Sequence, residues 1–194
     1  MEATPRLNHA PAGETDLSRF NNDWYTPGRG AVVRTLWFLV NGLVFQNPLV
    51  PLNGLKVGLL RLFGAQVGDG VVIKPSVNIK YPWRLRVGAN AWIGENVWID
   101  NLADVDIGPN CCLSQGSMLL CGNHNYALPT FDLIVGSITL EAGAWVGAKA
   151  LVCPGVRLGS HAVLAAMAVA TADLEPYGIY QGNPAMLKRK REIG

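Results

Sequence analysis

One histidine stands in a sequence context that suits acid–base chemistry. The 194-residue chain has only three histidines, and His124 is the one flanked by two amides, Asn123 and Asn125, that could orient its ring. A histidine side chain titrates near neutral pH, so its neutral form can take a proton from a substrate hydroxyl. His9 lies in a polar N-terminal stretch and His161 in a glycine-serine context that needs no catalytic explanation. We therefore predict His124 as a general base.

The segment that must position His124 repeats an aliphatic residue every six positions, often followed by glycine. Units this short cannot bury an apolar face alone, so consecutive units must stack and share one core. Six residues form a short strand and a corner, and three such units close a coil of about 18 residues. Recurrent glycines and β-branched residues disfavour the alternative, an amphipathic helix. The pattern predicts an all-β solenoid, a parallel β-helix of about five coils, and its inward residues include Val67, Ile73, Ile79, Val87, Ile93, Ile99, Ile107, Leu113, Leu119, Leu140, Val146, Val152, Leu158 and Leu164.

The repeat fails once, between Leu119 and Ile138, and His124 stands near the start of this interruption. A long excursion from a regular solenoid is normally either functional or disordered. Apolar residues such as Leu128 and Phe131 favour an ordered loop. The excursion is therefore the place where we expect chemistry.

Two apolar segments, residues 31–45 and 55–63, precede the repeats and are expected to form helices. The first interpretation is a cap over the open end of the solenoid, which would otherwise expose strand edges and core. The alternative is a peripheral contact with a membrane through residues 31–63, which Trp37 and Phe38 would suit. The first segment is shorter than the roughly 20 residues that cross a bilayer.

The expected domain organisation has four parts. They are a polar N-terminal arm (1–30), a helical cap (31–64), the β-helix (65–175) with its loop excursion (120–137), and a C-terminal extension with a basic tail (176–194).

Composition narrows the class of protein. The net charge of +2, without a basic stripe through the repeats, argues against nucleic-acid binding. The four cysteines lack metal-ligand spacing and are interpreted as reduced thiols of a cytosolic protein, and no metal site is predicted. The N-terminus has no secretion-signal pattern, so we expect a cytoplasmic protein, with the inner face of the membrane as the alternative location.

Three tryptophans, Trp92, Trp98 and Trp145, each directly precede an inward aliphatic residue. Alternation along a strand turns their side chains to the outside of the coil. Large outward aromatics indicate an interface between subunits or a platform for sugar. We expect a subunit interface.

Three features together resemble the left-handed β-helix acyltransferases. They are the hexads, the segment Gly122-Asn123-His124-Asn125-Tyr126, and the closing Gly182-Asn183-Pro184-Ala185. Within that group the chain is similar to the sugar O-acetyltransferases, most closely the colanic acid biosynthesis type, which Arg61-Leu62-Phe63-Gly64-Ala65 and Ile99-Asp100-Asn101-Leu102-Ala103 support. The resemblance covers residues 30 to 190 and implies a left-handed solenoid.

The resemblance also implies an activity and an assembly. The expected enzyme is an acetyl-CoA-dependent O-acetyltransferase that acetylates a sugar or glycan hydroxyl in polysaccharide, exopolysaccharide or glycolipid biosynthesis. It would need no metal and would form a homotrimer with active sites at subunit interfaces. His124 would be the base, and the backbone N–H of Ala148 would stabilise the oxyanion.

Further roles follow from the same resemblance. Asp100, with Asn123 and Asn125, would bind the acceptor, and Asp100 could instead orient His124 or cap its own turn. The residues expected to bind the cofactor are Ala148, Ala166, Thr171, Lys188 and Arg189. The chain departs from the family at Ala172, where lysine is common, and at Met186, where a basic residue is common, so the phosphate contacts at both positions are in doubt.

Other functions remain open at the level of sequence. An acyltransferase acting on an amino acid or amino sugar is the main alternative among enzymes. A non-catalytic scaffold would need only the hexads. A γ-type carbonic anhydrase shares the solenoid but needs three histidines for zinc, and only His124 and His161 lie in the repeat region.

Overall fold

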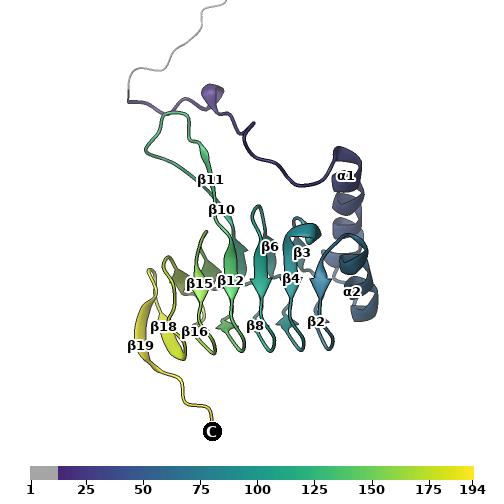
Figure 1. Ribbon diagram of the computed structural model, residues 1–194, viewed down its shortest axis with the longest axis vertical. Helices are drawn as coiled ribbons and strands as arrows, with labels where there is room; N and C mark the ends of the chain where they lie inside the picture. The colour runs from purple at the N-terminus through teal and green to yellow at the C-terminus, as the bar shows by residue number, and fades with distance from the viewer. Residues whose placement is uncertain (1–12) are drawn as a thin grey trace, which may run out of the picture.

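The computed structural model describes residues 13–194 and shows a β-solenoid with two helices over the end at which it begins (Figure 1). His9 and the first part of the expected arm lie outside the described residues.

The strands form three parallel sheets, which are the three faces of the coil. Face A contains β1 (Gln66–Val67), β4 (Leu85–Val87), β7 (Val105–Ile107), β12 (Ile138–Leu140) and β15 (Arg157–Leu158). Face B contains β2 (Val72–Ile73), β5 (Trp92–Ile93), β8 (Cys112–Leu113), β13 (Trp145–Val146), β16 (Val163–Leu164) and β18 (Gly178–Gln181), with β19 (Met186–Lys190) antiparallel to β18. Face C contains β3 (Asn78–Ile79), β6 (Trp98–Asp100), β9 (Met118–Leu120), β14 (Leu151–Val152) and β17 (Val169–Ala170).

The solenoid is longer than the sequence suggested. Faces A and C each have five strands, and a sixth turn begins with the bridge between Leu158 and Leu174 and continues into β18. The expectation of about five coils thus missed this partial turn, because its residues lack the hexad pattern.

The core is a set of stacked columns. Ile73, Ile93, Leu113, Val146 and Leu164 are paired in register on face B and are all at most 2% exposed. Each inward side chain packs in one continuous core with the inward residues of the other two faces and of the neighbouring coils. The predicted core, built from the aliphatic residue of each six-residue repeat, is confirmed, and among the residues predicted to form it Val67 alone is partly rather than fully buried.

The repeated glycines have a reason other than a tight turn. At Gly88 an added Cβ would lie 2.4 Å from the backbone nitrogen of Pro109, in the next coil. Glycine is required because stacked backbones approach too closely for any side chain. The left-handed corner positions are often occupied by asparagine, as at Asn90, Asn96 and Asn110, with φ of 57°, 58° and 56°.

The two expected helical segments cover the open end of the solenoid (Figure 1). They are α1 (Ala31–Val40), continued by the π-helical η2 (Asn41–Phe45), and α2 (Asn53–Leu62). Trp37 is 2% exposed and its Nε1 donates to the carbonyl of Ile79 at 2.8 Å. The buried Lys56 donates from Nζ to the carbonyl of Lys74 at 2.9 Å, and burial lowers the pKa of this lysine. The cap interpretation is confirmed.

Short 3-10 turns, η1 (Leu17–Arg19) and η3 (Pro82–Arg84), complete the helical elements. Within residues 13–194, every helix is too short or too polar to cross a bilayer.

The column architecture predicts the cost of a core deletion. Ile93→Ala should lower the free energy of unfolding by about 2–5 kcal/mol, because the neighbouring coils cannot collapse into the cavity. Ile93→Val should cost only about 0.5–1.5 kcal/mol. Urea unfolding followed by circular dichroism measures both values, and equal stability of the two variants would contradict a core shared between stacked coils.

Candidate active site

The loop excursion forms a hairpin at the corner between faces C and A. It leaves face C after β9 and rejoins face A at β12 through the antiparallel strands β10 (Gly122–His124) and β11 (Leu133–Val135). His124 is the last residue of β10 and pairs with Leu133. In Figure 1 this hairpin projects away from the solenoid. The excursion is ordered by strand pairing, as its composition indicated.

The ring of His124 is held in one orientation. Its Nδ1 lies 2.8 Å from the carbonyl oxygen of Phe131, and its ring stacks on the Phe131 ring with centroids 4.4 Å apart and planes inclined by 8°. A carbonyl oxygen only accepts, so Nδ1 must carry the proton and Nε2 is the unprotonated nitrogen of the neutral ring. This tautomer is the one that a general base at Nε2 requires.

Phe131 has an unusual backbone conformation at this place. Its φ is 53°, in the left-handed region that bulky residues avoid. Strain of this kind persists only where surrounding contacts impose it, and it gathers at functional sites. Here it points the carbonyl of Phe131 at His124, a role that the sequence did not reveal.

The amides beside His124 stabilise the hairpin locally. The Oδ1 of Asn123 accepts from the backbone N–H of His124 at 2.8 Å, and the Oδ1 of Asn125 accepts from that of Ala127 at 3.1 Å. Neither amide bonds to the ring. They fix the backbone that carries His124 rather than its imidazole.

The N-terminal segment also reaches the hairpin. The N–H of Asp16 donates to the carbonyl of Pro129 at 2.8 Å, and the Phe20 ring lies 5.7 Å from the His124 ring. Farther along, the Tyr25 hydroxyl donates to the carbonyl of Leu102 at 2.8 Å, and burial raises its pKa to about 12. The sequence indicated a polar arm here, and Phe20 carried no signal of its place beside His124 except that it is an aromatic residue in a polar stretch.

Asp100 lies at the same corner as the hairpin. It is 7% exposed, and its Oδ1 accepts from Nζ of Lys80 at 2.9 Å. Its Oδ2 lies beside Gly122 at the base of the hairpin, 3.9 Å from the position that a Cβ on this glycine would occupy. No hydrogen bond joins it to His124 within residues 13–194, and the Nδ1 of His124 is bonded to the carbonyl of Phe131 instead. The carbonyl of Phe131, rather than Asp100, orients the ring.

A pocket of about 490 Å³ extends from Asp100 along face C to α1. Its lining combines aromatic, amide and charged side chains, namely Arg34, Trp37, Phe38, Asn41, Gln46, Asn78, Lys80, Tyr81, Trp98 and Asp100. Aromatic faces beside carboxylate and amide groups can bind the apolar faces and the hydroxyls of a sugar.

Cys121, immediately before the hairpin, is the nearest thiol. It is fully buried, and burial raises its pKa to about 11. Near neutral pH this thiol is protonated and out of reach, so it does not serve as a nucleophile.

A second site lies at a different corner, between faces B and C. A groove of about 800 Å³ runs along corner residues of successive coils, Gln115, Ala148 and Ala166. The three are stacked, since the carbonyls of Gln115 and Ala148 accept from Lys149 and Met167 of the following coils, each at 2.9 Å. Trp145 lines the groove and donates to the Ser114 hydroxyl at 2.9 Å.

The corner N–H groups along this groove are available to a ligand. Within residues 13–194, the N–H groups of Gln115, Ala148 and Ala166 donate to no protein acceptor. The expected alignment of Ala148 with Ala166, one coil apart, is therefore present. Because the corners of Gln115 and Ala166 leave such a donor free as well, the free N–H by itself does not distinguish Ala148 from its stacked neighbours.

The basic tail contributes arginines to the same groove. Arg189 and Arg191 line it, and Arg191 also donates to the carbonyls of Gly143 and His161, each at 3.2 Å. Lys188 does not line it; this residue lies at the irregularity in the pairing of β19 with β18, where Ile179 pairs with Arg189 and Tyr180 pairs with Leu187. Thr171 follows β17 at the corner between faces C and A, also outside the groove.

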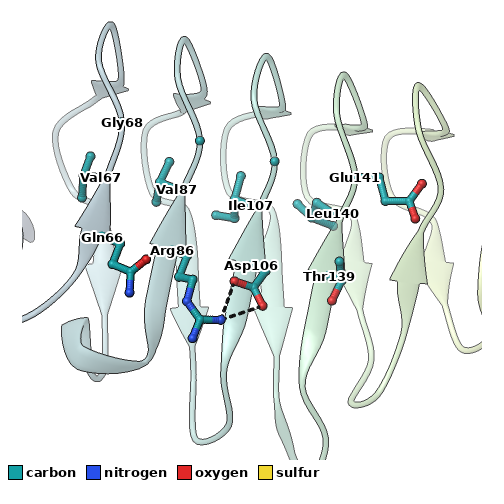
Figure 2. A pocket seen from close by; sticks show the side chains of 12 residues that line it. Gln66, Val67, Gly68, Arg86, Val87, Asp106, Ile107, Thr139, Leu140 and Glu141 are labelled. Atoms are coloured by element: carbon teal, nitrogen blue, oxygen red, sulfur yellow. Dashed lines mark hydrogen bonds and ion pairs between the residues drawn. The ribbon is translucent and has the colours of Figure 1, made fainter.

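The outer surface of face A differs from the other two. Its outward residues are Gln66, Arg86, Asp106, Thr139 and Arg157, and Arg86 bonds Asp106 at 3.1 and 3.3 Å over a shallow depression of about 590 Å³ (Figure 2). Face B presents Val72, Trp92, Cys112, Trp145, Val163 and Ile179, and face C presents Asn78, Trp98, Met118, Leu151 and Val169. The three tryptophans do point outward as expected, at 56%, 44% and 43% exposure for Trp92, Trp98 and Trp145.

The predicted site residues thus form two clusters. His124, Asn123, Asn125 and Asp100 lie at the corner between faces C and A, whereas Ala148, Ala166 and Arg189 lie at the corner between faces B and C. One chain by itself separates the expected base from the expected oxyanion donor.

Solved structures show the class of fold. A hexapeptide-repeat containing acetyltransferase from Vibrio cholerae superposes with a TM-score of 0.75 at 21% identity, covering 84% of this chain and 92% of that one. It has also been solved with acetyl-CoA. A galactoside acetyltransferase in complex with coenzyme A superposes with a TM-score of 0.66 at 23% identity, covering 83% and 82%. The solenoid is that of the hexapeptide-repeat acetyltransferases.

Sequence comparison gives the family. The chain is 35% identical over 176 residues to the Escherichia coli protein named as colanic acid biosynthesis acetyltransferase WcaF, covering 91% of this chain and 97% of that protein. The galactoside O-acetyltransferase of E. coli is 25% identical over 138 residues, 70% of this chain and 68% of that protein. No family model matches the sequence. The chain belongs to the hexapeptide-repeat acetyltransferase family that includes WcaF, which confirms the resemblance.

The tautomer of His124 can be measured directly. In protein labelled with ¹⁵N-histidine, long-range ¹H–¹⁵N correlation spectra above neutral pH should show the proton of His124 on Nδ1, because the Phe131 carbonyl accepts it. Neutral histidine exposed to water usually carries the proton on Nε2. His124→Gln identifies the signals, and a proton found on Nε2 would contradict the site geometry.

Proposed function

We propose that the protein is an acetyl-CoA-dependent O-acetyltransferase that acetylates a sugar hydroxyl, in polysaccharide, exopolysaccharide or glycolipid biosynthesis, in the cytoplasm. The observation that carries the proposal is the ring of His124, whose Nδ1 bond to Phe131 leaves Nε2 unprotonated on a projecting hairpin. The family supplies acetyl transfer, and a sugar acceptor is the choice that WcaF and the galactoside enzyme favour by name.

The chemistry follows from this tautomer. Nε2 of His124 takes the proton of the acceptor hydroxyl while the hydroxyl oxygen attacks the carbonyl carbon of the thioester. The carbonyl oxygen becomes an oxyanion, which the free N–H of Ala148 stabilises. The tetrahedral intermediate collapses with cleavage of the carbon–sulfur bond, and the CoA thiolate recovers the proton from the imidazolium. The products are the acetyl ester and free CoA.

The groove at the corner between faces B and C suits the donor. An extended pantetheine arm carries amide groups that can bond the stacked corner residues Ala148 and Ala166, and Trp145 offers an apolar wall. Arg189 and Arg191 stand at the groove for the phosphates. Arg191 thus joins Arg189 as a phosphate ligand, whereas Lys188 and Thr171 contribute only from a neighbouring subunit or a rearranged tail.

A homotrimer brings the two clusters together. Both corners border face C, so a closed ring in which the hairpin corner of each subunit meets the groove corner of the next turns face C toward the three-fold axis. The outward residues of face C include Trp98, Met118, Leu151 and Val169, which suit burial there. The polar face A is left in water. The acceptor enters beside Asp100, at the base of the hairpin.

Loss of the base should abolish most activity. His124→Ala should lower acetyl transfer by at least about a hundredfold, because the hydroxyl then keeps its proton during attack. The measurement is release of free CoA from acetyl-CoA with a panel of sugars, nucleotide sugars, lipid-linked oligosaccharides and amino sugars. His161→Ala is the matched control, since that ring stacks on Tyr177 away from the groove lining and the hairpin. Full activity of His124→Ala would exclude this mechanism, and a preference for amines would replace the hydroxyl acceptor.

Mixed trimers test the shared site. His124→Ala removes the base, and Ala166→Trp should block the groove, so each variant alone should be inactive. Random co-assembly of equal amounts restores roughly a quarter of the sites if base and groove come from neighbouring subunits. Co-refolded mixtures assayed for CoA release measure this recovery. A mixture as inactive as its components would place both groups in one subunit.

A further inference from the structure

We propose that the outer surface of the helical cap docks on a lipid bilayer that contains anionic headgroups. The surface is defined by the exposed aliphatic residues of α1, η2 and α2 and by the basic residues beside them. The buried sides of the same helices hold the cap on the solenoid, so the two surfaces do not compete.

The apolar part is a continuous helical stripe. Val32, Leu36, Leu39 and Leu43 recur at i, i+4, i+7 and i+11 and are 72%, 51%, 51% and 69% exposed. Phe38, on the same helix, is 73% exposed. The following loop and α2 add Leu49, Leu52, Leu55 and Leu62 at 86%, 59%, 46% and 78%. Leucine and phenylalanine exposed to this extent within two adjacent helices suit insertion into the boundary between headgroups and acyl chains.

The charge around this stripe is almost entirely positive. Between Asp23 and Glu95 the sequence has eight basic residues and a single acidic one, Asp69. Several of these cations are paired or buried in the solenoid, but Arg29, Arg34 and Lys74 are exposed and make no salt bridge within residues 13–194. Arg29 lies just before α1, and Lys74 lies directly after β2, beneath α2. Arg34 lies on the side of α1 that lines the pocket, opposite the leucine stripe. Cations at the rim of an inserted aliphatic surface are the arrangement that anionic lipids attract.

Trp37 does not belong to this surface. The sequence suggested that Trp37 and Phe38 would both suit a membrane. Trp37, however, is 2% exposed, and its ring N–H is bonded to the carbonyl of Ile79. Phe38 therefore supplies the aromatic contact.

Membrane docking would also narrow the choice of acceptor, and this part of the proposal rests on the proposed acetyl transfer to a sugar. Arg34 and Phe38 belong to α1, and both line the pocket that ends at Asp100. A bilayer held against the cap places that pocket at the lipid surface, which suits a lipid-linked glycan as the acceptor. In a trimer with solenoids along the three-fold axis, three caps point the same way and bind multivalently.

Sedimentation with vesicles tests the docking without any enzymatic readout. The whole protein should pellet with vesicles of phosphatidylcholine and phosphatidylglycerol, and much less with phosphatidylcholine alone or at high salt. Leu36→Ser/Leu39→Ser should lower partitioning at least about tenfold. The matched control, Leu187→Ser/Ile193→Ser, removes two exposed aliphatic residues near the C-terminus and should bind like the parent.

A second variant keeps the test independent of the leucines. Arg34→Glu/Lys74→Glu leaves every aliphatic side chain in place and should abolish the preference for phosphatidylglycerol. Absence of binding to anionic vesicles by the parent, binding by both of these double variants equal to that of the parent, or a changed mass in solution for Leu36→Ser/Leu39→Ser would overturn the proposal. The last result would show that the surface contacts another protein chain. Activity on soluble acceptors is measured separately, so failure of docking and failure of the proposed chemistry are distinguishable.

Discussion

The close stacking of successive coils is the constraint on which the whole molecule depends. Each inward aliphatic residue packs on the same position in the neighbouring coils and on the inward residues of the other two faces. The glycines beside these residues leave space for a neighbouring backbone so close that a Cβ added at Gly88 would lie 2.4 Å from the nitrogen of Pro109. The same spacing aligns the corners. A column of corner N–H groups, among them Ala148 and Ala166, is therefore a consequence of core packing before it is a binding site.

The proposed base, His124, stands where this regularity is interrupted. The hairpin of His124 leaves the coil after β9, and its two strands replace the support that stacking gives elsewhere. The ring is then oriented by a backbone carbonyl, and Phe131 adopts a left-handed conformation to present it. A carbonyl cannot change its protonation state, so it selects one tautomer of His124 over the whole range in which the ring is neutral.

The cap and the solenoid divide the molecule by polarity. Face A carries charged and polar residues, and face C carries mainly apolar ones. The outside of the cap combines exposed leucines with cations that make no salt bridge within residues 13–194. These surfaces differ because only the inward positions are needed for folding, so the outward positions are free to serve assembly and binding. The proposed trimer around face C and the proposed membrane contact of the cap use mainly different surfaces, which meet where Phe38 and Trp98 line one pocket.

The sequence alone determined the solenoid, because a six-residue period admits few other ways to bury its aliphatic residues. It also singled out His124, since a loop that breaks such a repeat is conspicuous, and it aligned Ala148 with Ala166 by coil length. Only the tertiary structure decided the partners of His124. The Phe131 carbonyl reaches the ring because the hairpin reverses the chain, and the Phe20 ring reaches it from an N-terminal segment that is distant in sequence. The tertiary structure also decided which cations line the groove, since the pairing of β19 with β18, irregular at Lys188, brings in Arg189 and leaves Lys188 outside. Such choices depend on which way a strand turns its side chains, and a basic run does not specify that direction.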